Sequence, residues 1–238
     1  MSRKYLAWRV RILSGPIVAF REYFFREVLP PFGNIDVRAD TLRNECFNNI
    51  GRQLARDDGI DMADAADAAQ EHALDWWEMM TSLRQSMLNL AAAGLFHLVE
   101  QQLTTLSADG LFRGDKLPDT KLSNVSQWYR DELDIDLTAL PSWKRIGEMR
   151  KVANTIKHGE GSSAKQLRAL RPELFVNPAY NRIYEREGLS MAERMREQKL
   201  AAPLSGEDFF VTEEVLLEYA TSAEAFFNEI AAAFEQQG

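Results

Sequence analysis

The sequence from residue 61 to residue 106 is DMADAADAAQEHALDWWEMMTSLRQSMLNLAAAGLFHLVEQQLTTL. It contains no proline and a single glycine, Gly94, and its apolar side chains recur at intervals of three and four residues. An α-helix repeats about every 3.6 residues, so this pattern predicts one very long helix or two abutting helices. We expect this segment to be the centre of a helical bundle.

The flanking sequence predicts further helices and almost no strand. Proline, glycine and capping residues delimit amphipathic stretches at about 16–28, 40–56, 124–133, 141–157 and from 213 onward. Residues 208–211 are the one fair strand candidate. Residues 180–202 are strongly charged and helix-prone, so we expect a charged helical excursion there. The predicted fold class is all-α.

Composition places the chain among ordinary globular proteins. It has 238 residues, of which 45% are hydrophobic and 27% charged. We expect residues 1–60 to form N-terminal helices that pack on a bundle made by residues 61–238. The two parts are expected to form one continuous domain.

Charge, cysteine content and hydropathy restrict the function classes. The net charge of −8 argues against a surface built throughout to hold nucleic acid, although a local basic site remains compatible with it. The single cysteine, Cys46, allows no intrachain disulfide and fits a reducing compartment. No apolar run approaches the roughly 18 residues of a membrane span, and Arg9 and Arg11 interrupt any signal-peptide core. We therefore expect a cytoplasmic protein that does not bind a membrane.

Three histidines give little material for a metal site. His97 follows Leu95 and Phe96 on an apolar helix, which favours a core or interface position over a ligand role. His72 belongs to a stripe of acids that a solvated helix face explains better than a cation site, because no Glu-x-x-His pair accompanies it. Neither a metal nor another cofactor is expected.

The segment RKVANTIKHG, residues 150–159, is the strongest candidate for chemistry. At about 100° per residue, Arg150, Asn154 and His158 stay within an arc of about 80° beside the apolar face of a helix. An arginine can neutralise charge on phosphoryl oxygens, and a histidine can transfer protons near neutral pH. An asparagine can orient the substrate or the imidazole.

The same residues also fit an ordinary helix end. Cationic side chains favour the carbonyl end of a helix, and a glycine such as Gly159 often follows the last turn. In that interpretation Arg150 and Asn154 are solvated and His158 has no chemical role. Spacing alone leaves both interpretations open.

Positive charge is concentrated around this segment. Eight lysines and arginines lie between residues 144 and 171, against two acids, Glu148 and Glu160. An RNA-binding surface needs such local positive potential. The candidate RNA-binding residues are Lys151, Lys157, Arg168 and Arg171.

The segment resembles the HEPN superfamily, whose members are small helical bundles that often dimerise. Their motif is an arginine, usually followed by a polar residue, and then, after four to six intervening residues, a histidine near the end of a late core helix. Asn154 and Lys157-His158-Gly159 resemble the end of that motif, and residues 94–103 resemble an early bundle helix. The resemblance extends over residues 85–235 at most. Seven residues separate Arg150 from His158, one more than the usual maximum. Lys151 precedes His158 with the usual six intervening residues, but it is a lysine where the motif has an arginine.

The resemblance implies an endoribonuclease that needs no metal. Many HEPN proteins of toxin–antitoxin and phage-defence systems have that activity, with a composite site formed by two protomers. His158 would be the acid or base, Arg150 would stabilise the transition state, and Asn154 would position the attacked group. A homodimer acting on RNA is then expected. The alternative is a catalytically inactive helical interaction or regulatory module of a toxin–antitoxin or defence complex, which would bind a protein partner and which the net charge of −8 favours.

Overall fold

The computed structural model describes residues 2–54, 61–108, 122–195 and 200–236, and every regular element in these ranges is helical. The all-α prediction is confirmed. The α-helices are α1 (Arg3–Leu13), α2 (Gly15–Tyr23), α3 (Ile35–Leu54), α4 (Met62–Ala108), α5 (Leu122–Leu133), α6 (Trp143–His158), α7 (Ser162–Leu170), α8 (Asn181–Glu187), α9 (Met191–Arg194) and α10 (Glu213–Gln236). A π-helical turn, η1 (Phe24–Val28), extends α2, and single 3-10 turns are η2 (Pro30–Phe32), η3 (Leu137–Ala139), η4 (Pro172–Phe175) and η5 (Pro178–Tyr180).

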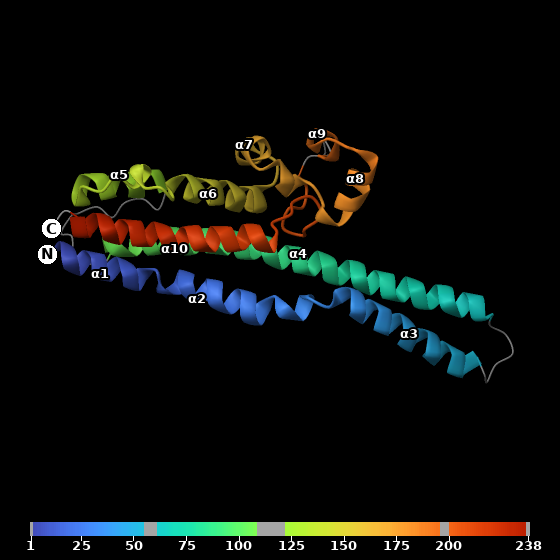
Figure 1. Ribbon diagram of the computed structural model, residues 1–238. Coiled ribbons are helices and arrows are strands. Elements are labelled where there is room, and N and C mark those ends of the chain that lie inside the picture. The colour runs from blue at the N-terminus through green and yellow to red at the C-terminus, as the bar shows by residue number, and fades with distance from the viewer. Residues whose placement is uncertain (1, 55–60, 109–121, 196–199, 237–238) are drawn as a thin grey trace.

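Helix α4 is one unbroken helix of 47 residues and forms the axis of the molecule. Figure 1 shows it running along most of the length of an elongated bundle. Helices α6 and α10 pack against its second half. Because these helices cover it, that half of α4 carries apolar side chains on most sides. Leu88, Leu95, Val99 and Leu103 are fully buried there. The prediction of a long central helix is confirmed.

Helix α10 closes the core on the side of the N-terminal helices. Its aromatic and aliphatic face is buried, including Tyr219, Phe226, Phe227 and Phe234. Helices α1 and α2 pack against it, and Figure 1 shows the two chain termini at the same end of the bundle. The first helices therefore share the core of the bundle. The boundary expected near residue 60 falls on residues 55–60, outside the described ranges.

Helix α3 and the adjacent residues 62–80 of α4 form an antiparallel pair that we call the arm. The arm projects beyond the other helices in Figure 1. The buried side chains of its α4 half are small, namely Ala65, Ala69 and Ala73 at intervals of four residues. Alanines allow close approach of two helices but bury little apolar area. Larger apolar side chains, including Val37 and Leu74, remain exposed.

The strand candidate at residues 208–211 is not a strand. Its backbone is instead held by Asn89 of α4, whose side chain donates to the carbonyl of Phe209 at 2.8 Å and accepts from the amide of Val211 at 3.1 Å. The buried amide of Gln85 also donates to the carbonyl of Val211 at 2.9 Å. These side chains satisfy the polar groups that a partner strand would otherwise pair.

The charged excursion contains the two short helices α8 and α9. Ser190 caps α9 in a capping box with Glu193. Residues 196–199 of this excursion lie outside the described ranges. None of the helices in the described residues is both long and apolar enough to cross a bilayer.

Candidate functional site

An open groove of about 500 Å³ lies between α4 and α6. Helix α6 contributes Arg150, Asn154 and Lys157 to its lining. Helix α4 contributes His97, Glu100, Gln101 and Thr104 beside the buried Phe96, and Leu122 lines one end. The groove therefore contains two cations and an amide from α6 and an imidazole from α4. The sequence predicts groups of these kinds together, but all of them on α6.

The periodicity of α6 explains why its polar residues line the groove. Ile146, Met149, Val152, Ala153 and Ile156 are buried, as the sequence predicts. Arg150, Asn154 and Lys157 follow one another at intervals of four and three residues, which keeps them within an arc of about 60°. That arc flanks the buried face and borders α4.

Arg150, Asn154 and Lys157 keep their polar groups available. Arg150 and Lys157 are exposed and Asn154 is half-buried. Within the described part of the chain, none of the three makes an ion pair or a side-chain hydrogen bond to another residue. They contrast with Arg145, Arg168 and Arg171 nearby, each of which is paired with a carboxylate. Among these four arginines, Arg150 is the one with no carboxylate partner in the described residues.

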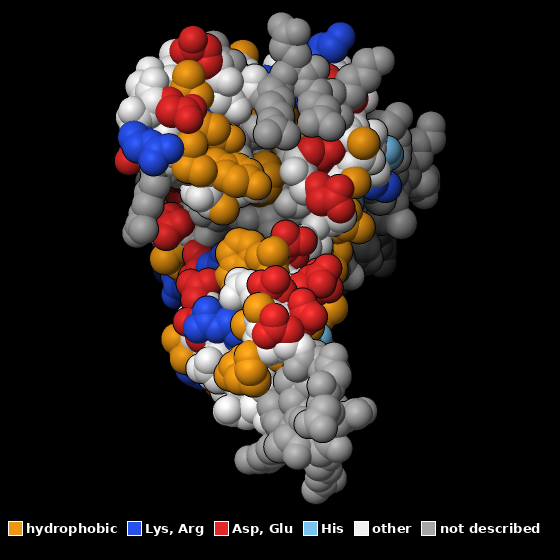
Figure 2. All heavy atoms as spheres, turned by 90° about the vertical axis from the view of Figure 1, so that its right-hand side faces the viewer, with side chains coloured by type: hydrophobic (Ala, Val, Ile, Leu, Met, Phe, Trp, Pro, Cys, Tyr) orange, Lys and Arg blue, Asp and Glu red, His pale blue; other side chains and the backbone are white. Residues whose placement is uncertain are grey.

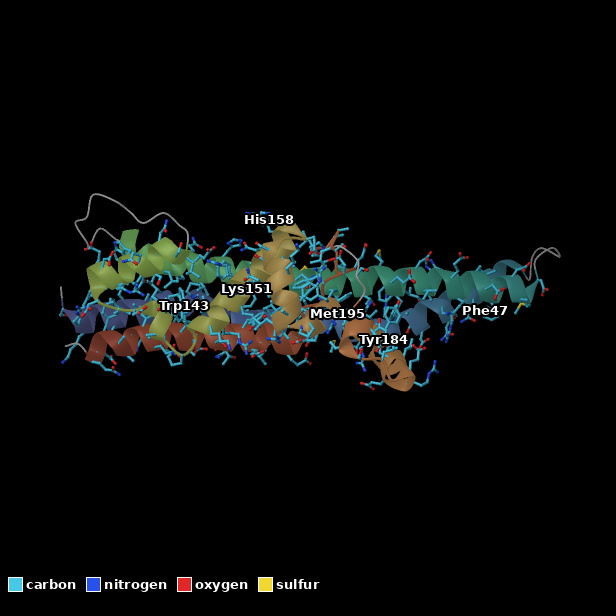
Figure 3. All side chains as sticks on the ribbon, turned by 90° about the horizontal axis from the view of Figure 1, so that it is seen from above. Phe47, Trp143, Lys151, His158, Tyr184 and Met195 are labelled. Carbon is cyan, nitrogen blue, oxygen red and sulfur yellow. The ribbon has the colours of Figure 1, made fainter. Side chains whose placement is uncertain are left out.

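His158 lies at the end of α6, outside the set of residues that line the groove. Figure 3 shows it at the opposite end of the helix from Trp143, with Lys151 between them. Its side chain is exposed, and Gly159 follows it with a φ of 66°, which ends the helix as the sequence predicts. Relative to Arg150, His158 is rotated by about 80° around the axis, whereas Lys157 is rotated by only about 20° to the other side. The structure therefore brings Lys157, rather than His158, into line with Arg150 and Asn154.

His97 is the imidazole in the groove. The sequence favoured a core or an interface position for it; the core position is wrong, because 58% of its side chain is exposed, and the interface position stays a prediction. Its neighbours Leu95, Phe96 and Val99 point into the bundle, and the helical repeat directs His97 outward. Its Nδ1 lies 3.1 Å from Oε2 of Glu100, one turn further along α4.

The other three predicted RNA-binding cations, Lys151, Arg168 and Arg171, donate hydrogen bonds to groups of the protein itself. Lys151 donates to the carbonyl of Gly147 at 3.3 Å. Arg168 donates to both carboxylate oxygens of Glu160, at 2.7 and 2.6 Å, and its guanidinium lies 4.9 Å from the ring centroid of Phe175. The hydrogen bonds from Arg168 hold the pKa of Glu160 below its usual value. Of the four candidates, only Lys157 lines the groove.

Arg171 belongs to a buried ionic cluster centred on Glu148. Oε1 of Glu148 accepts from Arg171 at 2.6 Å and from the hydroxyl of Tyr219 at 2.7 Å, while Oε2 accepts from Arg145 at 2.7 Å. Burial, with the adjacent carboxylate of Glu148, raises the pKa of the Tyr219 hydroxyl. The cluster joins α6 to α10 and to the end of α7. The cluster fixes the position of α6, and its ion pairs occupy the guanidinium of Arg171, which is therefore a structural residue.

Sequence reasoning missed the α4 side of the groove. His97, Glu100, Gln101 and Thr104 recur at intervals of three, one and three residues, which is the spacing of one helix face. That polar face was the available signal, but the apolar neighbours of His97 concealed it. No group of three or more histidine, cysteine or acidic residues that could hold a metal ion occurs among the residues that the structure describes.

Comparison with known proteins yields no relative. No family model, no curated protein and no solved structure matches the chain significantly.

Proposed function

We propose that this chain is a cytoplasmic, HEPN-like endoribonuclease that cleaves RNA at the α4–α6 groove without a metal cofactor. The observation that carries the proposal is the guanidinium of Arg150, which has no partner among the described residues and lies in a groove that also contains Asn154, Lys157 and His97. Among the described residues that line the groove, Arg150 and Lys157 outweigh one carboxylate, Glu100, which gives this lining a positive charge on an acidic protein. Such a groove suits a phosphodiester.

The side chains of the groove match the needs of phosphodiester cleavage. Arg150 would neutralise the charge that develops on the non-bridging oxygens as phosphorus becomes five-coordinate. Asn154 would position the attacked phosphate, and Lys157 would bind that phosphate or its neighbour. RNA carries its own nucleophile, the 2′-hydroxyl, so such a site requires proton transfer and charge stabilisation but no activated water.

A homodimer is part of the proposal. On α4, the exposed Leu83, Leu90 and Gly94 lie on the same face as His97 and lead along the helix to the groove. Exposed leucines at helical spacing, with a glycine that permits close approach, support packing of a second copy beside the site. In a composite site of the HEPN kind, His158 of each protomer would then act at the paired grooves.

The second candidate is a catalytically inactive interaction or regulatory module. The arm favours it: Val37, Met62, Leu74 and Met79 are exposed on a helix pair whose α4 half buries only alanines. Figure 2 views the molecule from the side on which the arm ends and shows hydrophobic and acidic side chains intermixed on this face. Exposed apolar surface of this kind is common at protein interfaces.

Incubation of the purified full-length protein with labelled single-stranded RNA in excess EDTA tests the proposal. We expect endonucleolytic products that end in a 2′,3′-cyclic phosphate and a 5′-hydroxyl, and a dimeric mass by light scattering. Intact RNA after incubation with folded dimeric protein would reject the nuclease and leave the interaction module. Cleavage that disappears when EDTA is added would reject the metal-free mechanism.

A further inference from the structure

We infer that His97 is a further catalytic residue of the groove, the general base toward the RNA 2′-hydroxyl, and that Glu100 is its positioning residue. The inference rests on the ribonuclease activity proposed above. It differs from the role that the HEPN motif would give to His158, because it places the base on α4, opposite the cation on α6.

The first support is position. Of the three histidines in the chain, His97 is the one that lines the groove with Arg150 and Asn154. His72 lies far along α4 on the arm, and His158 lies at the end of α6. A general base has to reach the substrate that the cation binds, and His97 shares the groove with that cation.

The second support is the orientation of the ring. With its proton on Nδ1, His97 donates to Oε2 of Glu100 at 3.1 Å, and this leaves the lone pair of Nε2 as the available base. Glu100 is the less exposed partner, with 25% of its side chain accessible against 58% for His97. The less exposed carboxylate of Glu100 therefore orients the ring, and the imidazole of His97 remains accessible from the groove. An imidazole oriented by a carboxylate is a recurrent design for a base.

The third support is rigidity. Base and cation come from different helices, but both helices belong to the same packed core. Phe96 and Val99 of α4 are buried next to His97, and Val152 and Ala153 of α6 are buried between Arg150 and Asn154 in sequence. Catalytic groups on packed helices keep their separation better than groups on loops.

The step that this geometry permits balances without a further reactant. The 2′-hydroxyl proton moves to Nε2 of His97, and the 2′-oxygen forms a bond to phosphorus. The bond from phosphorus to the 5′-oxygen breaks, and the leaving oxygen takes a proton from solvent. The products are a 2′,3′-cyclic phosphate and a 5′-hydroxyl, and His97 returns its proton to solvent. Arg150 compensates the additional negative charge of the five-coordinate phosphorus.

Steady-state cleavage of labelled RNA by His97→Ala tests the inference, with His72→Ala as the matched control. Both histidines are exposed on α4, but only His97 lines the groove. We expect His97→Ala to lower kcat by roughly 100-fold to 10,000-fold with little change in KM, and exogenous imidazole to restore part of the rate. His72→Ala should cleave like wild type. Glu100→Gln, which loses the charge but keeps the shape, should lower kcat by roughly tenfold.

Two outcomes separate this inference from the function on which it rests. If wild type cleaves RNA and His97→Ala cleaves it at the same kcat, His97 is not the base, although the nuclease stands. If His97→Ala raises KM but leaves kcat unchanged, the catalytic role is likewise overturned, because His97 then only binds substrate. If folded wild type cleaves no RNA, the nuclease and the role of His97 both fail.

Discussion

At the scale of single residues, the environment of each cation distinguishes structural from functional roles. Arg145, Arg168 and Arg171 are all paired with carboxylates, whereas Arg150 has no such partner among the residues that the structure describes. The sequence shows that these side chains cluster, but it does not show all of their partners, because some of the pairs connect residues far apart in the chain. Arg145 and Glu218, for example, are 73 positions apart. Candidate RNA-binding residues therefore could not be separated from structural ones by charge alone.

The Glu148 cluster leads to a prediction about stability. Glu148→Gln removes the charge that compensates Arg145 and Arg171 in a buried setting, so we expect a loss of about 3 kcal/mol in the free energy of unfolding. Glu218→Gln is the matched control, since Glu218 pairs with the same two arginines but is 40% exposed. Its loss should stay below about 1 kcal/mol. Equal losses in urea denaturation would contradict the central place of Glu148.

At the scale of elements, the sequence predicts helices better than it predicts their free faces. Pro141 and Gly159 bracket α6 closely, and the absence of a helix breaker from 61 to 106 predicts α4 well. The second half of α4 is apolar on most sides, so its exposed face depends on where α6 and α10 pack. That dependence is why the periodicity of α4 alone did not identify His97 as exposed. The arc of Arg150 and Asn154 was predictable, because α6 has one clear apolar face.

The end of α6 leads to a prediction about Gly159. Its φ of 66° is costly for other residues, and a Cβ there would lie 2.9 Å from the carbonyl oxygen of Leu200. We expect Gly159→Ala to destabilise the protein by about 1–2 kcal/mol or more. Gly161→Ala should change stability by less than about 0.5 kcal/mol, because the backbone there is extended and no atom lies within 4 Å of the added Cβ. Denaturant midpoints that shift equally would contradict this explanation of the helix end.

At the scale of the whole molecule, an acidic protein presents a small cationic groove on one side of its central helix and, at one end, an arm with exposed apolar and acidic side chains. The net charge of −8 argues against binding of RNA across the whole surface, so the RNA contact that we propose is local. In that proposal the groove binds RNA, and the arm and the exposed α4 face are the candidate surfaces for a second protein chain. Overall charge and composition could not reveal this segregation, because both are sums over a fold that separates the charges.

We propose that RNA is cleaved in the α4–α6 groove. The most direct measurement compares kcat/KM for RNA cleavage by Arg150→Ala and Lys144→Ala. Both residues are exposed cations on α6, but only Arg150 lines the groove. We expect a loss of about 100-fold or more in kcat/KM for Arg150→Ala and a near wild-type value for Lys144→Ala, with the circular dichroism spectrum unchanged in both. Equal activity of the two folded variants would show that cleavage does not occur in this groove.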